Sequence, residues 1–246
     1  MKSIFLLLLL LISYRISGCE LTVRLETYAA QSQLKENVWH GLDVELVTTL
    51  LNEAKCQYSF IDLPWGRSLK LLESGDIDLM LSVSKTSPRE SFAYFIGPQR
   101  TETIIFASHS STTAISTLDE LFAQTKPFAI QRGAFYGTEF NNKLNQREHS
   151  ANMITVTDNQ TKLELLRSKR ISGYLEAKLN VLFEIENVPE LKKLQIHPVV
   201  INQAPVYFAV SKNSVSKEQI SQLEAAFNKL KHEGKFATIL AKYDVN

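Results

Sequence analysis

The sequence has little cysteine, no excess of charge and only one long apolar run. Its 246 residues include two cysteines, 27 lysines and arginines and 26 acidic residues, which give a formal net charge of +1. Because the charges are balanced, the chain lacks the excess of basic residues that attracts nucleic acid or an anionic membrane. We therefore expect no nucleic-acid partner. The chain is 44% hydrophobic and 22% charged, an ordinary globular composition, and its length suits two lobes or one large domain.

Several catalytic and metal-binding patterns are also missing. The chain contains neither a Gly-x-Ser-x-Gly nucleophile elbow nor a glycine-rich phosphate-binding loop. Its five histidines are scattered without the spacing of metal ligands: His40, His109, His149, His197 and His232. We therefore expect no metal site, no cofactor and no enzymatic activity.

The one long apolar run lies near the start of the sequence. Residues 1–18 contain the basic Lys2, an apolar run over residues 4–12 and a small-residue end, which is the pattern of a cleaved secretory signal peptide. A membrane anchor would need about 20 apolar residues, and Arg15 interrupts this run too early. Cleavage would remove two bases and leave 25 basic and 26 acidic residues. We expect an exported, periplasmic protein.

The two cysteines support two interpretations. The stretch ISGC, which ends at Cys19, resembles a bacterial lipobox, so a lipid anchor at Cys19 is one alternative. The other is a disulfide, because residues 21–26 and 56–63 are typical of strands, and a right-handed crossover would make them parallel neighbours. Cys19 and Cys56 would then lie at the same ends of adjacent strands, within reach of the roughly 5.5 Å Cα separation that a disulfide needs.

We favour the disulfide over the lipid anchor. In a lipobox the cysteine follows the apolar core directly, whereas Tyr14 and Arg15 interrupt the run here. An exported compartment permits a disulfide bond.

Strand and helix patterns alternate along the chain. Strand-like stretches at 21–26, 56–63 and 77–83 alternate with helical stretches at 41–54 and 66–75. This alternation predicts a mostly parallel sheet covered by helices on both faces.

A second, similar unit follows downstream. It contains a strand at 126–133, a helix at 160–170 and a strand at 171–176. Extended stretches on either side of this unit predict two crossings, near residues 101–103 and 203–205. The expected organisation of the α/β chain is therefore a signal peptide at 1–18, lobe I at 19–102 and 206–246, and lobe II at 103–205.

Four motifs in order carry a resemblance to a known family. They are HGLDVELV at 40–47, ESGDIDLMLS at 73–82, TSPRESFAYF at 86–95 and LKHEGKFATILAKY at 230–243. Over nearly all of residues 20–244 the chain resembles the family 3 bacterial extracellular solute-binding proteins, periplasmic receptors for polar amino acids that deliver ligand to ABC importers. The resemblance implies a two-lobed, type II periplasmic-binding-protein fold, each lobe a mostly parallel sheet flanked by helices, with two hinge crossings.

The resemblance also implies a ligand site. In the family a signature arginine holds the ligand carboxylate, and the resemblance implies that Arg89 does so here. Ser82 and Ser84 match neighbouring family positions whose backbone or hydroxyl groups also hold the carboxylate. A guanidinium suits the role because it stays charged and offers paired donors that match a carboxylate. Further positions that match ligand-contacting positions of the family are Tyr28, Trp65 with the adjacent Arg67, and the glycine turn at Gly133, Ala134 and Phe135.

Two departures from the family pattern leave the ligand open. Phe135 stands where many amino-acid receptors have a hydroxyl residue, and Ala177 stands where they keep an aspartate for the α-amino group. Glu176 would serve as the ammonium acceptor if the strand end is shifted, although successive strand residues point to opposite faces. Arg132, at the expected cleft edge, would favour an acidic or phosphorylated ligand, unless it is a solvated surface residue.

These observations predict a monomeric, extracytoplasmic binding protein. It would clamp a small carboxylate-bearing ligand, an amino acid or a related polar metabolite, and its membrane partner would be the permease of an ABC importer. Two alternatives stay open: a ligand-sensing receptor lobe that feeds a membrane sensor, and a cyclohexadienyl-dehydratase-like enzyme with Glu176 as the general acid.

Overall fold

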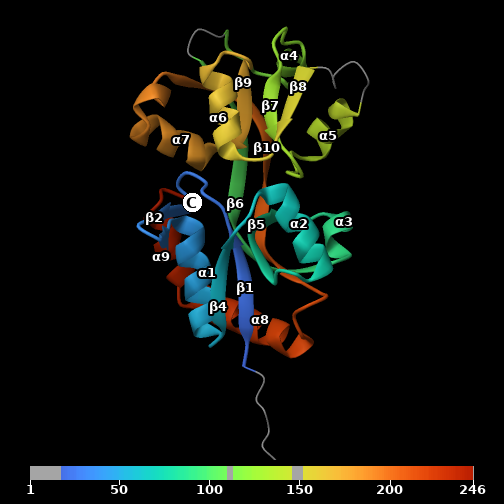
Figure 1. Ribbon diagram of the computed structural model, residues 1–246, viewed down its shortest axis with the longest axis vertical. Coiled ribbons are helices and arrows are strands. Elements are labelled where there is room, and N and C mark those ends of the chain that lie inside the picture. The colour runs from blue at the N-terminus through green and yellow to red at the C-terminus, as the bar shows by residue number, and fades with distance from the viewer. Residues whose placement is uncertain (1–17, 110–112, 146–151, 246) are drawn as a thin grey trace, which may run out of the picture.

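The computed structural model describes residues 18–109, 113–145 and 152–245, so the predicted signal peptide lies outside these ranges except for its last residue. The chain builds an eight-stranded sheet in the order β4-β1-β5-β10-β6-β9-β7-β8, and helices pack around it (Figure 1). The strands are β1 (Glu20–Leu25), β4 (Gln57–Asp62), β5 (Leu79–Ser84), β6 (Ala93–His109), β7 (Phe128–Gln131), β8 (Met153–Val156), β9 (Gly173–Ala177) and β10 (Leu194–Ser211).

The helices occur between the strands and after the last one. They are α1 (Leu42–Glu53), α2 (Trp65–Ser74), α3 (Ser87–Glu90), α4 (Leu118–Phe122), α5 (Thr138–Leu144), α6 (Asn159–Arg167), α7 (Lys178–Asn187), the 3-10 helix η2 (Pro189–Leu191), α8 (Lys217–His232) and α9 (Lys235–Ala241). Among the described residues, no helix is both long and apolar enough to cross a membrane.

The lower part of Figure 1, which we call the first half, contains β1, β4, β5, α1 to α3, α8 and α9. Strand β1 pairs in parallel with β4 and with β5, as the alternating pattern predicts. The apolar stripe of α1 packs against β1, β5, α8 and α9 in one core cluster, which includes Leu46, Leu50 and Phe227. Gly41 precedes α1 with φ 124°, and a Cβ there would lie 2.5 Å from the Gln31 carbonyl oxygen, so this turn requires glycine.

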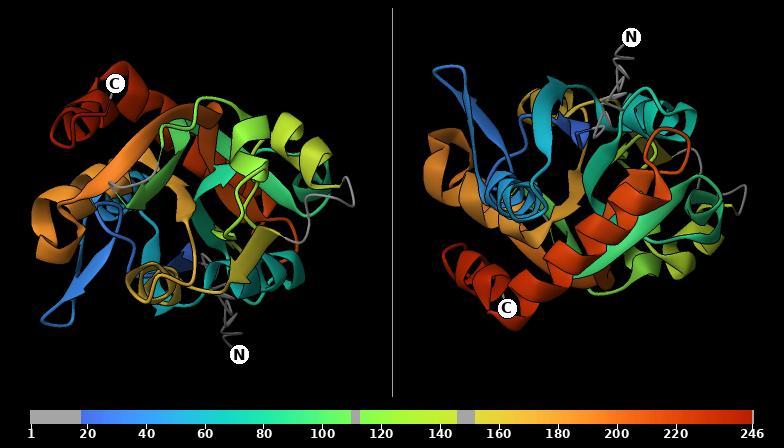
Figure 2. Two further views of the ribbon diagram at one scale, coloured as in Figure 1. Left: turned by 90° about the horizontal axis from the view of Figure 1, so that it is seen from above. Right: turned by 90° about the horizontal axis from the view of Figure 1, so that it is seen from below.

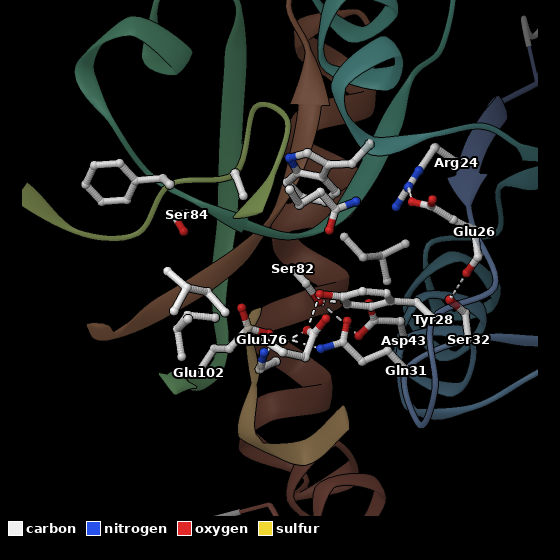
Figure 3. Close-up of a pocket in the computed structure, with 18 of the residues that line it drawn as sticks. Arg24, Glu26, Tyr28, Gln31, Ser32, Asp43, Ser82, Ser84, Glu102 and Glu176 are labelled. Atoms are coloured by element: carbon white, nitrogen blue, oxygen red, sulfur yellow. Dashed lines mark hydrogen bonds and ion pairs between the residues drawn. The ribbon is translucent and has the colours of Figure 1, made fainter. Parts of the chain in front are cut away.

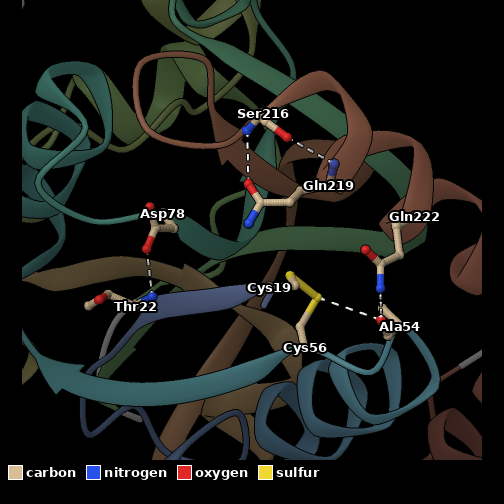
Figure 4. Close-up of a disulfide and its surroundings, with 8 residues drawn as sticks. All are labelled: Cys19, Thr22, Ala54, Cys56, Asp78, Ser216, Gln219 and Gln222. Carbon is tan, nitrogen blue, oxygen red and sulfur yellow. Dashed lines mark hydrogen bonds between the residues drawn. A yellow bond between two sulfur atoms is a disulfide. The ribbon is translucent and has the colours of Figure 1, made fainter. Parts of the chain in front are cut away.

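The first half also contains the predicted disulfide. Cys19 and Cys56 are bonded, with their Cα atoms 4.5 Å apart, just before the parallel strands β1 and β4 begin (Figure 4). The prediction from strand adjacency is therefore confirmed. A sulfur in a disulfide cannot also carry a thioether-linked lipid.

The upper part of Figure 1, the second half, contains β7 to β9 and α4 to α7. Strand β7 pairs in parallel with β8 and β9, while β9 runs antiparallel to β6. Two apolar clusters fill this half, one around Phe106, Phe128 and Phe140, and the other around Tyr174 and Val181. Each half therefore has apolar clusters of its own, and the α/β class with mostly parallel, helix-flanked sheets is confirmed.

Two long antiparallel strands, β6 and β10, run through both halves. At the predicted crossings, Thr101 pairs with Pro205, and Thr103 pairs with Gln203. The two crossings thus lie side by side, where bending would change the angle between the halves. The residue boundaries of the two lobes stay a prediction.

The sequence reading missed several elements. These are the hairpin of β2 (Gln33–Lys35) and β3 (Val38–His40), strand β8 and helices α3, α4, α5 and α7. The hairpin extends away from the rest of the chain in both views of Figure 2, and its Leu34 and Val38 are 43% and 54% exposed.

Candidate functional site

A pocket lies between the two halves, beside the crossings. It is lined by side chains from β1, β5, α2 and α3 on one side and from β9 and the turn after β7 on the other, and its free space amounts to about 70 Å³ (Figure 3). Eight of the ten residues predicted to contact ligand line it: Tyr28, Trp65, Ser82, Ser84, Arg89, Ala134, Phe135 and Glu176. Their roles in binding stay predictions.

Two predicted residues lie outside the pocket lining. Arg67 is exposed on α2, and Gly133 is exposed in the turn after β7. Gly133 still takes part in the site, because its carbonyl oxygen accepts a hydrogen bond from Arg89. Arg132 is also exposed and does not line the pocket.

Arg89 is a buried cation that faces the pocket. It lies on the short helix α3 and is 8% exposed, with Nη1 donating to the Ser84 carbonyl at 2.8 Å and Nη2 to the Gly133 carbonyl at 2.9 Å. Burial lowers its pKa to about 10, which still leaves the guanidinium charged at neutral pH. Within the described part of the chain, no acidic side chain forms an ion pair with Arg89.

Ser82 lies at a strained position near the end of β5. Its φ of 57° is in the left-handed region, which a side chain other than glycine adopts only when surrounding contacts stabilise it. The hydroxyl donates to both carboxylate oxygens of Asp43, at 3.0 and 2.8 Å. Two residues further along β5, the Ser84 carbonyl accepts a hydrogen bond from Arg89.

Trp65 begins α2 and forms part of the pocket wall. Its indole Nε1 is buried and has no hydrogen-bond partner within the described residues. The Arg24 guanidinium lies 5.3 Å from its ring centroid, in the range of a cation–π contact. The Gly133 turn of the second half packs closely on the same helix, because a Cβ on Gly133 would lie 3.3 Å from Leu69 Cδ1 and 3.7 Å from Trp65 Cδ1.

The pair Arg24–Glu26 forms another part of the lining that the sequence reading missed. The two side chains form an ion pair, and Arg24 Nε also donates to the Leu63 carbonyl at 2.8 Å. Burial lowers the pKa of Arg24 and raises the pKa of Glu26, while the ion pair opposes both shifts. Arg24 and Glu26 lie next to each other on one side of the pocket (Figure 3).

Glu176 lies at the end of β9 and is 2% exposed. Its Oε1 accepts from Tyr28 Oη, from the Ala177 backbone N–H at 2.7 Å and from Asn180 Nδ2 at 3.2 Å. Its Oε2 forms an ion pair with Lys162, which reaches it from α6. The sequence reading missed Lys162, and with it both carboxylate oxygens of Glu176 have partners from the chain itself.

A third charged group involves the crossing strand β6. Arg100 Nη2 lies 3.0 Å from Glu102 Oε1, and Arg100 Nη1 lies 3.1 Å from Asp43 Oδ1. Gln31 Nε2 donates to Glu102 at 3.1 Å. Burial raises the pKa of Glu102, although Arg100 opposes the shift.

Direct contacts join the halves across the pocket. Tyr28 follows β1 in the first half and donates to Glu176 in the second, and Arg89 donates to the Gly133 carbonyl. These contacts describe a closed arrangement in which little space is left between the halves.

The pocket offers donors for an anion but no metal centre. Within the described ranges, no group of three or more His, Cys, Asp or Glu side chains is placed to hold a metal ion. The chemistry that the geometry supports is non-covalent capture of a small polar solute.

Solved structures share the fold of this chain. An ancestral arginine-binding protein bound to arginine has 18% sequence identity and a TM-score of 0.80, and the match covers 91% of this chain and 97% of that chain. A histidine kinase sensor domain with similarity to periplasmic binding proteins has 17% identity and a TM-score of 0.77, covering 92% of this chain and 96% of that one.

A third solved structure is AbpA, an amino acid ABC transporter substrate-binding protein from Streptococcus pneumoniae bound to L-arginine. It has 21% identity and a TM-score of 0.75, with 91% of this chain and 94% of that chain covered. At these identities the likeness shows a shared fold. A sequence comparison with curated proteins finds no match.

The family comparison covers almost the whole described chain. Residues 22–245 match the model of the bacterial extracellular solute-binding proteins, family 3. The match includes Cys56, the crossings and every residue predicted to contact ligand. It agrees with the resemblance inferred from the four sequence motifs, and the chain belongs to the bacterial extracellular solute-binding proteins, family 3.

Proposed function

We propose that this protein clamps a small carboxylate-bearing ligand, an amino acid or a related polar metabolite, and delivers it to the permease of an ABC importer. The observation that carries the proposal is Arg89, a buried cation that faces the pocket and has no acidic partner among the described residues. A buried charge is costly unless it is paired, so a ligand anion would complete this site.

The pocket also offers what surrounds a bound carboxylate. Arg89 supplies charge and donors, Trp65 supplies an apolar face with an unpaired N–H, and Phe135 closes the side of the second half. Phe135 has no hydroxyl, so on the second half a carboxylate would rely on the backbone N–H groups of Gly133 and Phe135, because the Ala134 N–H already donates to the Gln131 carbonyl at 3.2 Å.

Closure of the two halves is the proposed mechanism. The paired crossings of β6 and β10, near Thr101 to Thr103 and Gln203 to Pro205, are the proposed hinge. A ligand that contacts both halves would stabilise the closed form over the open one, and the population would shift toward closure. The proposed moving lobes are residues 19–102 with 206–246, and residues 103–205.

The proposed location is the periplasm, where the Cys19–Cys56 disulfide is compatible with the redox conditions. We propose a monomer, since a clamp that closes on its own pocket needs no second copy. The proposed membrane partner is a permease, in line with the ABC transporter protein AbpA that shares the fold.

A sensor role is the second candidate. The histidine kinase sensor domain among the similar structures has the same fold over 96% of its length, and a closing clamp would serve a sensor equally well. Pull-down of the mature protein with inner-membrane fractions distinguishes the two, because an importer role predicts capture of a permease and a sensor role predicts capture of a kinase.

We propose that the protein is not an enzyme. The dehydratase-like alternative needs Glu176 as a general acid, yet both of its carboxylate oxygens already accept hydrogen bonds from the chain's own donors. Incubation with prephenate tests this directly, and its turnover would overturn the proposal.

A thermal-shift screen of the mature protein tests the proposed function. The screen contains amino acids, small peptides, organic acids and prephenate. A ligand that binds only the folded state raises the melting temperature as its concentration increases. We expect at least one carboxylate to do so, whereas a screen in which no compound raises the melting temperature would contradict the proposal.

A further inference from the structure

Some of the charged side chains around the pocket already balance one another. Arg24 forms an ion pair with Glu26, and Lys162 forms an ion pair with Glu176. Each pair contains one cation and one anion, so neither pair needs a charged group of a ligand to balance it. The charges of a bound ligand therefore have to match the charged groups that remain.

The remaining charges form one positive and one negative site. Arg89 donates to two carbonyl oxygens and has no acidic partner within the described residues. Arg100, in contrast, is shared by two acids, Asp43 at 3.1 Å and Glu102 at 3.0 Å. When both acids are ionised, this group has a surplus of one negative charge. The pocket thus has a surplus positive charge at Arg89 and a surplus negative charge around Arg100.

Glu102 is the acid of this group that can accept a hydrogen bond from a ligand. Both carboxylate oxygens of Asp43 already accept from the Ser82 hydroxyl, at 3.0 and 2.8 Å. In Glu102, Oε1 accepts from Arg100 and from Gln31, whereas Oε2 has no hydrogen-bond partner among the described residues. The side chain of Glu102 is 18% exposed and lines the pocket. Its Oε2 is therefore available to a donor on the ligand.

Strand geometry directs Glu102 into the pocket. Glu102 and Ile104 are two residues apart on β6, so their side chains point to the same face, and both line the pocket. Ile104 pairs with Ala177 at the end of β9, which offers only a methyl group. Both carboxylate oxygens of the adjacent Glu176 have donors from the chain itself. Of Glu102 and Glu176, which are both labelled in Figure 3, only Glu102 has an oxygen without a partner among the described residues.

Glu26 is another pocket acid with an unpartnered oxygen. Its Oε2 is paired with Arg24, and its Oε1 has no partner within the part of the chain that the structure describes. The charge of Glu26 is already balanced by Arg24, so a ligand ammonium there would add an excess positive charge. At Glu102 the same ammonium would balance the surplus negative charge. The charge balance therefore favours Glu102 over Glu26.

The pKa of Glu102 agrees with a surplus negative charge around it. Burial raises this pKa most, and the charges of Asp43 and Glu176 raise it further, although Arg100 opposes the shift. A positive charge on a ligand would also oppose the shift and would favour the ionised carboxylate.

We propose that Glu102 binds a positively charged nitrogen of the ligand while Arg89 holds its carboxylate, so that the pocket takes carboxylates that also carry an ammonium group. This inference rests on the proposed function and narrows its ligand class. Glu102 lies within the proposed hinge at Thr101 to Thr103. The ammonium group would therefore contact the segment about which the two halves bend.

Matched ligand pairs test the inference on the wild-type protein. Isothermal titration calorimetry compares alanine with propionate, glutamate with glutarate, phenylalanine with 3-phenylpropionate, and 4-aminobutyrate with butyrate. The members of each pair differ only in the ammonium group. In the pair that binds most tightly, we expect the ammonium-bearing member to bind at least about tenfold more tightly than the other. A smaller preference, or a preference for the amine-free acid, would overturn the inference while leaving the proposed function intact.

The thermal-shift screen covers the case in which none of these pairs binds. Hits that all lack a carboxylate or an ammonium group would overturn the inference. A hit that carries both groups is compared with its amine-free analogue by the same tenfold criterion. If no compound of the pairs or of the screen binds, the proposed function itself is contradicted and the inference fails with it, so the two failures are distinguishable.

The variant Glu102→Gln tests the residue itself. Glutamine keeps the shape and an acceptor for Arg100 and Gln31, but it removes the surplus negative charge. Arg100 retains Asp43 as its ion-pair partner, so we expect the variant to fold. The preference for the ammonium-bearing member of the tightest pair should shrink to less than about threefold. An unchanged preference in folded Glu102→Gln would overturn the role of Glu102.

Two further variants make this test specific. Glu186→Gln is the matched control, because Glu186 is an exposed glutamate that does not line the pocket, and its preference should equal that of the wild type. Glu26→Gln tests the rival acceptor, and we expect it to retain the preference. A preference that is lost in Glu26→Gln and kept in Glu102→Gln would overturn the proposal.

A crystal structure of the wild-type protein decides the question if Glu102→Gln does not fold. With the tightest-binding ammonium-bearing ligand of the pairs, the ligand nitrogen should lie within about 3.2 Å of a Glu102 carboxylate oxygen. A ligand nitrogen bound to another carboxylate and not to Glu102 would overturn the proposal.

Discussion

The two halves of the molecule treat their buried charges differently. In the first half the buried charges line the pocket wall, and one of them, Arg89, has no acidic partner among the described residues. In the second half Glu176 also lines the pocket, but it is paired with the buried Lys162. Lys162 lies over the ring of Tyr174, whose hydroxyl donates to the buried Glu184, so these four side chains form one network. The incomplete charge is thus on one side of the pocket and the completed network on the other.

This difference predicts that ligand affinity and folding stability depend on different charged residues. A change to the unpaired cation should alter ligand affinity more than folding, because its missing partner is the ligand. A change to the completed network should alter folding first, because its partners belong to the chain. The disulfide gives the first half an additional covalent constraint that the second half does not share.

The largest expected effect is that of Lys162→Met on stability. Removing one member of a buried ion pair leaves an uncompensated charge on Glu176 and typically costs about 3–5 kcal/mol of unfolding free energy. Urea unfolding of the mature protein measures this loss. Lys193→Met is the matched control, because Lys193 is an exposed lysine of the second half, and it should change the unfolding free energy by less than about 0.5 kcal/mol.

The double variant Lys162→Met, Glu176→Gln sharpens the same test. It removes both charges of the pair, so much of the lost stability should return. A Lys162→Met protein as stable as the wild type would show that the second half does not depend on its completed network.

Next in size is the effect of removing the disulfide. The Cys19→Ser, Cys56→Ser variant opens a loop with a sequence separation of 37 residues. Loops of this kind contribute about 2–4 kcal/mol, chiefly by restricting the unfolded chain. Urea unfolding measures the loss, and ligand affinity serves as the control because the bond does not line the pocket. An affinity that falls with the disulfide would contradict the separation of binding from stability.

Arg89→Ala should reverse this pattern. Calorimetry should show a loss of at least about 2 kcal/mol of affinity for the carboxylate ligand, because a charge-assisted contact is removed. Folding should remain nearly intact. Arg170→Ala is the matched control, since Arg170 is an exposed arginine outside the pocket. Unchanged affinity in Arg89→Ala would refute the assignment.

The smallest effect concerns pH. Burial, with the nearby Glu176 charge, raises the pKa of Glu184 to about 7, although Lys162, Arg167 and the Tyr174 hydroxyl oppose the shift. The folded state therefore holds this proton more tightly than the unfolded state does. The contribution of Glu184 to stability is therefore greatest at low pH and falls as pH rises through 7, by roughly 2 kcal/mol between pH 5 and pH 8.

The variant Glu184→Gln isolates this contribution. It keeps an acceptor for the Tyr174 hydroxyl but cannot titrate, so its urea unfolding free energy should fall less than that of the wild type over the same pH range. Parallel pH profiles for the two proteins would contradict the assignment.

Local patterns predicted much of the first half. The crossover rule placed β1 beside β4 and so predicted the Cys19–Cys56 bond. The family resemblance, carried here by the TSPRESFAYF motif, predicted that Arg89 would lie at the pocket. These features depend on short segments whose periodicity and order are visible in the sequence.

The charge pairs could not be predicted in the same way. Lys162 lies in a polar helical stretch and reads as a solvent-facing residue, and only its contact with Glu176, formed when α6 packs on β9, makes it an interior group. Arg24 interrupts the apolar pattern of β1, which was a signal that the sequence offered. The missed β2–β3 hairpin turns at Glu36 and Asn37, which both have positive φ. Asparagine is common in such turns, so Asn37 was a signal that the sequence offered.

The central claim is that a ligand carboxylate forms the ion pair that Arg89 lacks among the described residues. The most direct measurement is the calorimetric affinity of the tightest-binding carboxylate beside that of its primary amide, which has nearly the same shape but no charge. The account predicts that the amide binds at least about 30-fold more weakly, equivalent to about 2 kcal/mol. Equal affinities for the acid and the amide would contradict it.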